Sequence, residues 1–212
     1  MSRLKAALFD LDGVVFDTEP QYTQFWIEMG RRYHPELPDL AHVIKGQTLV
    51  QIYDRFFASM PEAQSHITAQ LAEFEHQMTF TYVEGLEAFV TALHGRGLKT
   101  AIVTSSNRDK MANVYAAHPE VHQLFDKILT SEDFAKSKPD PDCYLKGAAC
   151  FGLKPDECVA FEDSFNGLKA VRAAGMQAIG LATTNSEEAI RPYCDVVLKD
   201  YKDWTHKIHL FT

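Results

Sequence analysis

The chain has 212 residues, 46% of them hydrophobic and 24% charged, and its 29 acidic side chains exceed its 21 lysines and arginines by eight. This composition is typical of a globular protein and excludes disordered, collagen-like and fibrous chains. The length suffices for one full domain and a smaller one without disulfide support, and the net charge of −8 disfavours nucleic acid as a partner.

Apolar segments of the chain are short. They fall far below the roughly 20 residues of a membrane span, so no membrane association is expected. The N-terminal apolar run 6–9 is too short for the apolar region of a signal peptide and ends at Asp10, so we expect a cytoplasmic protein. Four cysteines lie in apolar segments outside any C-x-x-C pair, which predicts reduced core residues. They are Cys143, Cys150, Cys158 and Cys194.

The first predicted element is a buried strand over residues 4–9, because this apolar run is short and has no helical period. It stops at Asp10-Leu11-Asp12-Gly13. From Pro20 to about Phe80, apolar and aromatic residues recur at helical spacing, which predicts an α-helical insert. We expect residues 17–82 to form a helical cap.

Strands alternate with amphipathic helices after residue 83. Helices are predicted over 86–93, after 107, and over 141–151 and 165–174; strands are predicted over 100–103, 127–129, 159–161, 178–181 and 196–198. Such alternation is typical of a parallel sheet covered by helices on both faces. The predicted fold is α/β: a doubly wound parallel sheet formed by residues 1–16 and 83–212, with an inserted α-helical cap domain.

Chemically active side chains follow successive predicted strands. They are Asp10 and Asp12, then Thr104-Ser105-Ser106-Asn107, then Lys138, then Glu162 and Asp163. Loops at the carboxyl ends of parallel strands meet at one edge of the sheet, so we expect these residues to share a pocket. Their joint occurrence favours a functional site, although each alone could be a turn or a helix cap.

The predicted pocket suits a phosphate ester and Mg²⁺. Asp10 and Asp163 offer the hard oxygen ligands that Mg²⁺ prefers, and Lys138 adds a positive charge that can keep Asp10 ionised. Gly13 and residues 105–107 can direct backbone N–H groups and hydroxyls at phosphate oxygens. We expect Ser105 or Ser106 to cap the following helix. Asp12 is expected to point to the other side of the backbone, free to move a proton.

Four motifs stand in order at the ends of predicted strands. They read Phe9-Asp10-Leu11-Asp12-Gly13-Val14-Val15-Phe16-Asp17-Thr18, Thr104 with Ser105-Ser106, Ser137-Lys138-Pro139-Asp140-Pro141, and Phe161-Glu162-Asp163-Ser164-Phe165-Asn166-Gly167. On these motifs the sequence resembles the haloacid dehalogenase superfamily, in the branch with an α-helical cap after the first strand, and most of all its β-phosphoglucomutase-like phosphatases. The resemblance covers nearly the whole chain.

The resemblance implies roles for the motif residues. Asp10 would attack phosphorus and become an aspartyl phosphate, while Asp12 would protonate the leaving alcohol and later activate water. Thr104 and Lys138 would orient and neutralise the phosphoryl group. Mg²⁺ would be held by Asp10, the main-chain oxygen of Asp12 and Asp163, with Glu162 close by or acting through water.

The resemblance also separates possible activities. Dehalogenases carry a non-acidic residue at the position of Asp12, so carbon–halogen cleavage is not expected. β-Phosphoglucomutases share all four motifs, but they carry an arginine where this chain has Leu49 and a histidine that aligns with Tyr22. These departures favour hydrolysis over the mutase alternative. Substrate-binding candidates where such caps meet the core are Lys45, Gly46, Gln47 and Thr48.

The sequence therefore predicts a Mg²⁺-dependent phosphatase that hydrolyses small phosphorylated metabolites, sugar-phosphate-like, through an aspartyl-phosphate intermediate. The alternatives are a β-phosphoglucomutase-type phosphomutase and, less favoured because of the cap and Asp12, a non-enzymatic phosphoacceptor domain of the receiver type. We expect a small phosphorylated metabolite as the partner and a monomer in solution.

Overall fold

The structure is a computed structural model that describes residues 4–202 and 204. Six parallel strands form one sheet in the order β3-β2-β1-β4-β5-β6. Their bounds are β1 Ala6–Phe9, β2 Lys99–Val103, β3 Lys127–Leu129, β4 Cys158–Glu162, β5 Gln177–Leu181 and β6 Val196–Leu198. This order and the helical crossovers confirm the predicted doubly wound α/β fold.

The strands form because they are short apolar runs that are buried on both faces of the sheet. In β1, Ala7 and Phe9 face one hydrophobic cluster, while Ala6 and Leu8 face another. The central strand β1 pairs with both β2 and β4, and Phe9 lies opposite Ile102 on one side and Phe161 on the other. The residues that follow these three strands therefore emerge together at one edge of the sheet.

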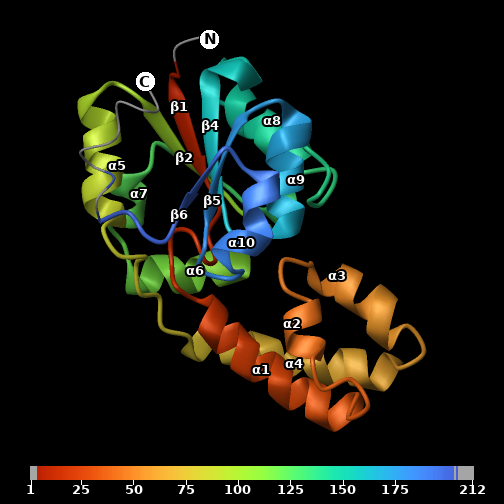
Figure 1. Ribbon diagram of the computed structural model, residues 1–212. Helices are drawn as coiled ribbons and strands as arrows, with labels where there is room; N and C mark the ends of the chain where they lie inside the picture. The colour runs from red at the N-terminus through yellow and green to blue at the C-terminus, as the bar shows by residue number, and fades with distance from the viewer. Residues whose placement is uncertain (1–3, 203, 205–212) are drawn as a thin grey trace.

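Helices cover both faces of the sheet (Figure 1). One face packs against α5 Leu86–Gly95, α6 Arg108–Ala117 and α7 Val121–Leu124, and the other against α8 Asp142–Ala149, α9 Phe165–Ala174 and α10 Glu187–Ile190. Several helices begin at side-chain caps; Ser164, for example, accepts a hydrogen bond from the Gly167 N–H at 3.0 Å and so starts α9. The cap is a preferred helix start because it satisfies a backbone donor that has no partner within the helix.

The segment between β1 and α5 is helical and has a core of its own. Its helices are α1 Glu19–Tyr33, α2 Leu40–Val43, α3 Leu49–Ile52, a π-helical turn Tyr53–Phe57 and α4 Pro61–Gln77, and they lie together beyond one edge of the sheet (Figure 1). They bury a hydrophobic cluster that includes Phe25, Trp26, Phe57 and Ile67. A separate core is what an independently packed unit requires.

Two adjacent segments, which lie outside the six strands, connect this cap to the sheet. Phe16 forms an antiparallel bridge with Tyr82, the Asp17 N–H donates to the Thr81 carbonyl at 2.8 Å, and the Val83 N–H donates to the Val15 carbonyl at 3.0 Å. The entry and exit of the cap therefore lie side by side. We place the domain boundaries here, between residues 16 and 17 and between 82 and 83, as a proposal.

Some details differ from the sequence-based expectations. Cys143 and Cys158 are buried, but Cys150 is exposed and Cys194 half-buried, so the prediction of four core cysteines is wrong for these two; all four are free thiols. The helix predicted over 141–151 ends at Ala149, because the chain turns through Gly152 at a φ of 67°. Among the described residues, the helices are too short or too polar to cross a bilayer.

Candidate active site

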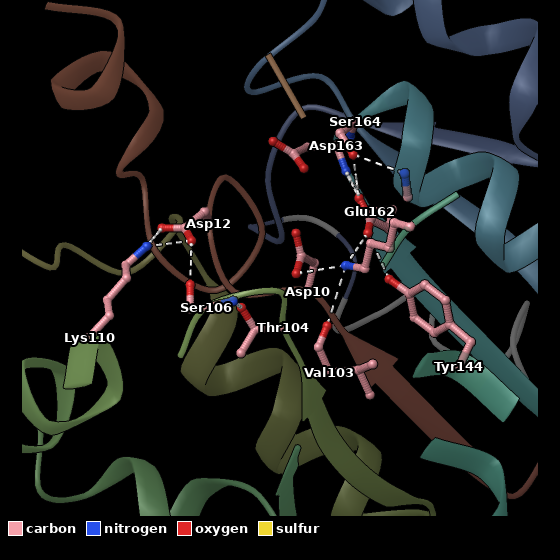
Figure 2. Close-up of polar contacts among 12 residues, drawn as sticks. Asp10, Asp12, Val103, Thr104, Ser106, Lys110, Tyr144, Glu162, Asp163 and Ser164 are labelled. Atoms are coloured by element: carbon pink, nitrogen blue, oxygen red, sulfur yellow. Dashed lines mark hydrogen bonds and ion pairs between the residues drawn. The ribbon is translucent and has the colours of Figure 1, made fainter. Parts of the chain in front are cut away.

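Three carboxylates meet at the carboxyl edge of the sheet. Asp10 directly follows β1, Glu162 is the last residue of β4, and Asp163 directly follows it. One oxygen of each lies within 4.8 Å of the others. The topology thus brings together acidic groups that are more than 150 residues apart in the sequence, as the strand ends predicted (Figure 2).

Lys138 lies between two of these carboxylates. Its Nζ is 2.9 Å from Asp10 Oδ1 and 2.6 Å from Glu162 Oε1, and its side chain is nearly fully buried. Burial raises the pKa of Asp10 to about 7, with Lys138 acting in the opposite direction. Burial alone would lower the pKa of Lys138, but Asp10 and Glu162 raise it above its ordinary value. The ammonium therefore remains charged and faces Asp10.

Glu162 is held by hydrogen bonds to both carboxylate oxygens. Besides Lys138, the Tyr144 hydroxyl donates to Oε1 at 2.8 Å, and Oε2 accepts from the Asp163 N–H at 3.1 Å and from the Ser164 hydroxyl at 3.2 Å. A fully buried carboxylate needs such partners to offset its desolvation. The arrangement fixes Glu162 as the group that positions Lys138.

Asp163 is buried beside other carboxylates, so its ionised form would be stabilised by an added cation. Burial, and next the neighbouring Glu162, raise the pKa of Asp163 well above its ordinary value. The Thr184 hydroxyl donates to Asp163 Oδ2. Gly13 closes over the same oxygen: a Cβ at position 13 would lie 2.0 Å from Asp163 Oδ2, and the φ of Gly13 is 71°, so only glycine fits.

The acidic cluster fits Mg²⁺. It consists of oxygen donors alone, which is the ligand type that Mg²⁺ prefers. Burial of like charges raises the pKa of both Asp10 and Asp163, and a divalent cation between them would stabilise their ionised forms. The residues present are therefore suited to the metal that the motifs imply.

Asp12 is oriented differently from Asp10. Its carboxylate accepts from Lys110 Nζ at 2.6 and 2.5 Å, from the Thr18 hydroxyl at 2.6 Å and from the Ser106 hydroxyl at 3.1 Å. In Figure 2 it points toward Lys110 and Ser106, whereas Asp10 is paired with Lys138. Burial by itself would raise the pKa of Asp12, but Lys110 and the hydroxyl donors lower it overall.

Asp12 points away from Asp10 as expected, and its role in proton transfer stays a prediction. Sequence reasoning missed its principal partner, Lys110. Lys110 lies in the first turn of α6, only 4% exposed, where a helical lysine would ordinarily be solvated. The sequence signal that could have placed Lys110 near the site is its position three residues after Asn107. Asn107 caps α6 by accepting from the Lys110 N–H at 2.9 Å. The expectation that Ser105 or Ser106 caps α6 is wrong, because Asn107 is the capping residue.

Of the other residues predicted to bind phosphate, some line the cleft, whereas Gly13 makes a contact within its own loop. Thr104 is buried and its Oγ1 accepts from the Ser106 N–H at 3.0 Å, while Ser105 is exposed at the cleft wall. The Gly13 N–H donates to the Phe16 carbonyl at 2.8 Å, so it is already used within its loop. The expected role of Gly13 as a phosphate-binding donor is corrected to a role in close packing against Asp163.

The segment 45–48 lies where the cap contacts the core, and its four residues line the same cleft as Asp10. Lys45 Nζ donates to the Thr184 carbonyl at 3.1 Å, and the Gly46 carbonyl accepts from Asn166 Nδ2 at 3.0 Å. Gln47 donates to the carbonyl of Val43, and Thr48 caps α3, so their side chains also have local structural roles.

The cleft between cap and core has a volume of about 480 Å³. Its core wall carries Asp10, Thr104 and Lys138. Its cap wall carries Glu19, whose pKa is raised to about 7 by burial and then by Asp12, and Tyr22, whose hydroxyl donates to Glu75 at 2.7 Å. A cavity of this size is suited to a small phosphorylated molecule.

Fold and site together define a doubly wound α/β core with a helical cap and an acidic, lysine-containing centre at the carboxyl ends of the strands. The family model described as "Hydrolase: haloacid dehalogenase-like hydrolase" matches residues 4–175. The chain belongs to the haloacid dehalogenase-like hydrolase family.

Individual relatives lie in the same branch. The chain is 34% identical to hexitol phosphatase A of Escherichia coli (strain K12) over 191 residues, covering 84% of this chain and 83% of that protein. It is 27% identical to the β-phosphoglucomutase of Bacillus subtilis (strain 168) over 192 residues, covering 84% and 82%. Among solved structures, a family IA, variant 3 hydrolase of Entamoeba histolytica has the same fold, with a TM-score of 0.80 at 22% identity over 94% of this chain and 95% of that one.

Proposed function

We propose that this protein is a Mg²⁺-dependent phosphatase that hydrolyses small, sugar-phosphate-like phosphate monoesters through an aspartyl phosphate on Asp10. The observation that carries the proposal is the meeting of Asp10, Lys138 and Asp163 at one edge of the sheet, in a cleft lined by the core and the cap. Hexitol phosphatase A of Escherichia coli, to which the chain is 34% identical, supports the reaction class.

In the first step, a carboxylate oxygen of Asp10 forms a bond to phosphorus as the bond from phosphorus to the ester oxygen breaks. Asp12, which must bind a proton before this step, gives that proton to the leaving alkoxide, which departs as an alcohol. Lys138, 2.9 Å from Asp10, neutralises charge on the phosphoryl oxygens. Thr104 and Ser105 offer hydroxyls at the same cleft wall.

In the second step, Asp12 takes a proton from a water molecule, whose oxygen attacks the phosphorus of the aspartyl phosphate. The acyl phosphate bond breaks, and Asp10 returns to a carboxylate as inorganic phosphate leaves. Mg²⁺, which Asp10, Asp163 and the main-chain oxygen of Asp12 would hold with Glu162 nearby, supplies charge neutralisation for the phosphoryl oxygens when bound.

Two features of the cap support hydrolysis over phosphomutase chemistry. Leu49 lines the cleft at the position where the mutase pattern has an arginine, and it has no charge to hold a second phosphate. Tyr22 replaces the mutase histidine, and its hydroxyl is occupied by Glu75. Asp12 also distinguishes the site from a phosphoacceptor domain. By activating water it would make the aspartyl phosphate short-lived, whereas the phosphorylated aspartate of a phosphoacceptor domain must persist.

The proposal is tested by measuring inorganic phosphate released from a panel of phosphorylated metabolites in the presence of MgCl₂. We expect release from at least one sugar or polyol phosphate, reversible loss on chelation with EDTA, and no release by the Asp10→Asn variant. Asp109→Asn is the matched control, because Asp109 is exposed on α6, away from the cleft. Turnover by Asp10→Asn, or conversion of β-glucose 1-phosphate to glucose 6-phosphate without phosphate release, would contradict the proposal.

A further inference from the structure

Lys110 is a buried cation that the proposed chemistry does not use. Its side chain is 3% exposed, and its Nζ contacts both carboxylate oxygens of Asp12, at 2.6 and 2.5 Å. Removing an ammonium from water has a high free-energy cost, so a buried lysine persists only where a paired charge and good geometry compensate. Asp12 provides that compensation.

The same ammonium also contacts the cap. Nζ lies 4.7 Å from the centroid of the Tyr22 ring on α1, a distance at which the ring attracts a cation. Tyr22 is in turn held by Glu75 of α4 through its hydroxyl, at 2.7 Å. Lys110 therefore joins a core carboxylate to a ring of the cap.

Asp12 has few ways to move within this arrangement. Besides Lys110, Thr18 donates to Oδ1 and Ser106 donates to Oδ2, at 2.6 and 3.1 Å. Each oxygen thus has one hydroxyl partner and shares the ammonium. The two hydroxyls come from separate segments, one at the start of the cap and one after β2. Of these three donors, Lys110 alone contacts both oxygens.

We infer that Lys110 is a positioning residue that orients the Asp12 carboxylate for proton transfer, with the Tyr22 ring of the cap completing the site of its ammonium. The inference rests on the proposed function, because it takes Asp12 as the group that exchanges the proton. Lys110 itself does not touch the reacting atoms in this assignment. Its contribution should therefore vanish when Asp12 can no longer transfer a proton.

The test is a double-mutant cycle of wild type, Lys110→Met, Asp12→Asn and the double variant. The kcat/KM is measured for phenyl phosphate and 4-nitrophenyl phosphate, which have similar shapes but differ in how much the leaving group needs a proton. We expect Lys110→Met to lower kcat/KM for phenyl phosphate about tenfold, which is less than the roughly 10²- to 10⁴-fold that general acid catalysis itself contributes, because a positioning residue supplies only part of it. The loss for 4-nitrophenyl phosphate should be smaller, with KM changed less than twofold.

In the Asp12→Asn background, we expect Lys110→Met to cause no further loss with either ester, because residues that act as a unit are not additive. An equal loss in both backgrounds, a change in KM alone, or unchanged kcat/KM in Lys110→Met would overturn the inference. If wild type releases no phosphate from any ester, the proposed function fails instead.

Stability is monitored in parallel by thermal unfolding. Lys110→Met leaves the Asp12 carboxylate buried beside a methyl group, which destabilises the fold, whereas the double variant has no orphaned charge. Should the single variant fail to fold, the comparison of Asp12→Asn with the double variant still decides the question, because unequal kcat/KM in that pair excludes action through Asp12. Lys110→Arg, which retains the charge, should recover part of the loss.

Discussion

Asp10 and Asp12 are two residues apart, yet their surroundings give them opposite tendencies to ionise. Burial raises the pKa of Asp10 to about 7. Burial also acts to raise the pKa of Asp12, but Lys110 and the hydroxyl donors together bring it below its ordinary value. Each aspartate is paired with its own lysine, Asp10 with Lys138 and Asp12 with Lys110. In the usual division of roles the proton donor has the raised pKa and the nucleophile is ionised. The roles proposed here for Asp10 and Asp12 therefore require Mg²⁺ to stabilise the ionised form of Asp10.

Gly13 has a testable role at the same scale. A Cβ on residue 13 would meet Asp163 Oδ2 at 2.0 Å and Thr184 Oγ1 at 2.8 Å. We expect Gly13→Ala to displace the Asp163 carboxylate and to weaken the apparent Mg²⁺ affinity by about 10- to 100-fold, the usual effect of disturbing groups that orient a metal ligand. The measurement is phosphate release titrated with MgCl₂.

Gly97→Ala is the matched control for this substitution. Its φ is 81°, and no atom lies within 4 Å of a Cβ at that position, so it carries the backbone cost of about 1–2 kcal/mol without a clash. Its Mg²⁺ dependence should equal that of wild type. An unchanged Mg²⁺ titration in Gly13→Ala would show that Asp163 does not hold the metal.

At the scale of elements, the cap contacts the core through the loop 45–48 and the adjoining helix α3, as well as through its two connecting segments. Gly46 contacts the start of α9 through Asn166, and Gln51 Nε2 of α3 donates to the Lys138 carbonyl at 3.0 Å. The loop and α3 therefore contact the two core segments that carry Asp163 and Lys138. The position of the cap over the proposed catalytic groups should depend on these contacts.

Gly46→Ala tests this attachment. The φ of Gly46 is 71°, and a Cβ there would lie 2.6 Å from the Cβ of Ser164, the cap residue of α9. We expect the loop to move away from α9, raising KM for the best substrate of the panel several-fold and lowering kcat, since small displacements of positioning groups reduce turnover strongly. Gly152→Ala, with a φ of 67° and open space around the Cβ, should leave both constants unchanged. Identical kinetics for the two variants would remove the loop from the proposed substrate site.

The whole molecule shows which features a sequence can predict. Strand 127–129 and helix 165–174 have the predicted bounds, because short apolar runs and a serine-capped amphipathic pattern are local signals. The convergence of Asp10, Lys138 and Asp163 could be predicted because topology alone brings parallel strand ends together.

The partners of these residues could not be predicted. Lys110 and Tyr144 lie on helices, where side chains of their type usually face solvent or the core, and no local pattern indicates which carboxylate they will contact. Their contacts depend on how α6 and α8 pack against the sheet and on where the cap lies. Packing of this kind is a property of the complete fold and leaves no period or motif in the chain.

The acidic centre also links metal binding to the stability of the molecule. The pKa of Asp10 is about 7, that of Glu19 is about 7 and that of Asp163 is well above its ordinary value, all three chiefly through burial. Unfolded aspartates and glutamates titrate near 4. Between these values the folded protein binds more protons than the unfolded chain, so the free energy of unfolding of the metal-free protein should fall as pH rises through about 7. Asp12, whose pKa is lowered, contributes in the opposite sense and only at acid pH.

Mg²⁺ should therefore stabilise the protein more at pH 8 than at pH 6, because at pH 6 it must displace protons from the carboxyl groups. At a Mg²⁺ concentration about 100 times the Kd, saturation adds about 2.7 kcal/mol, which for a chain of this length raises Tm by about 5–10 °C. Thermal unfolding at pH 6 and pH 8, with MgCl₂ or EDTA, measures the difference directly. Asp163→Asn should abolish the Mg²⁺-dependent increase at both pH values, since it removes a ligand and a buried charge together. An equal increase at the two pH values would mean that the carboxyl groups are already ionised without the metal, and an increase that survives in Asp163→Asn would place the cation elsewhere.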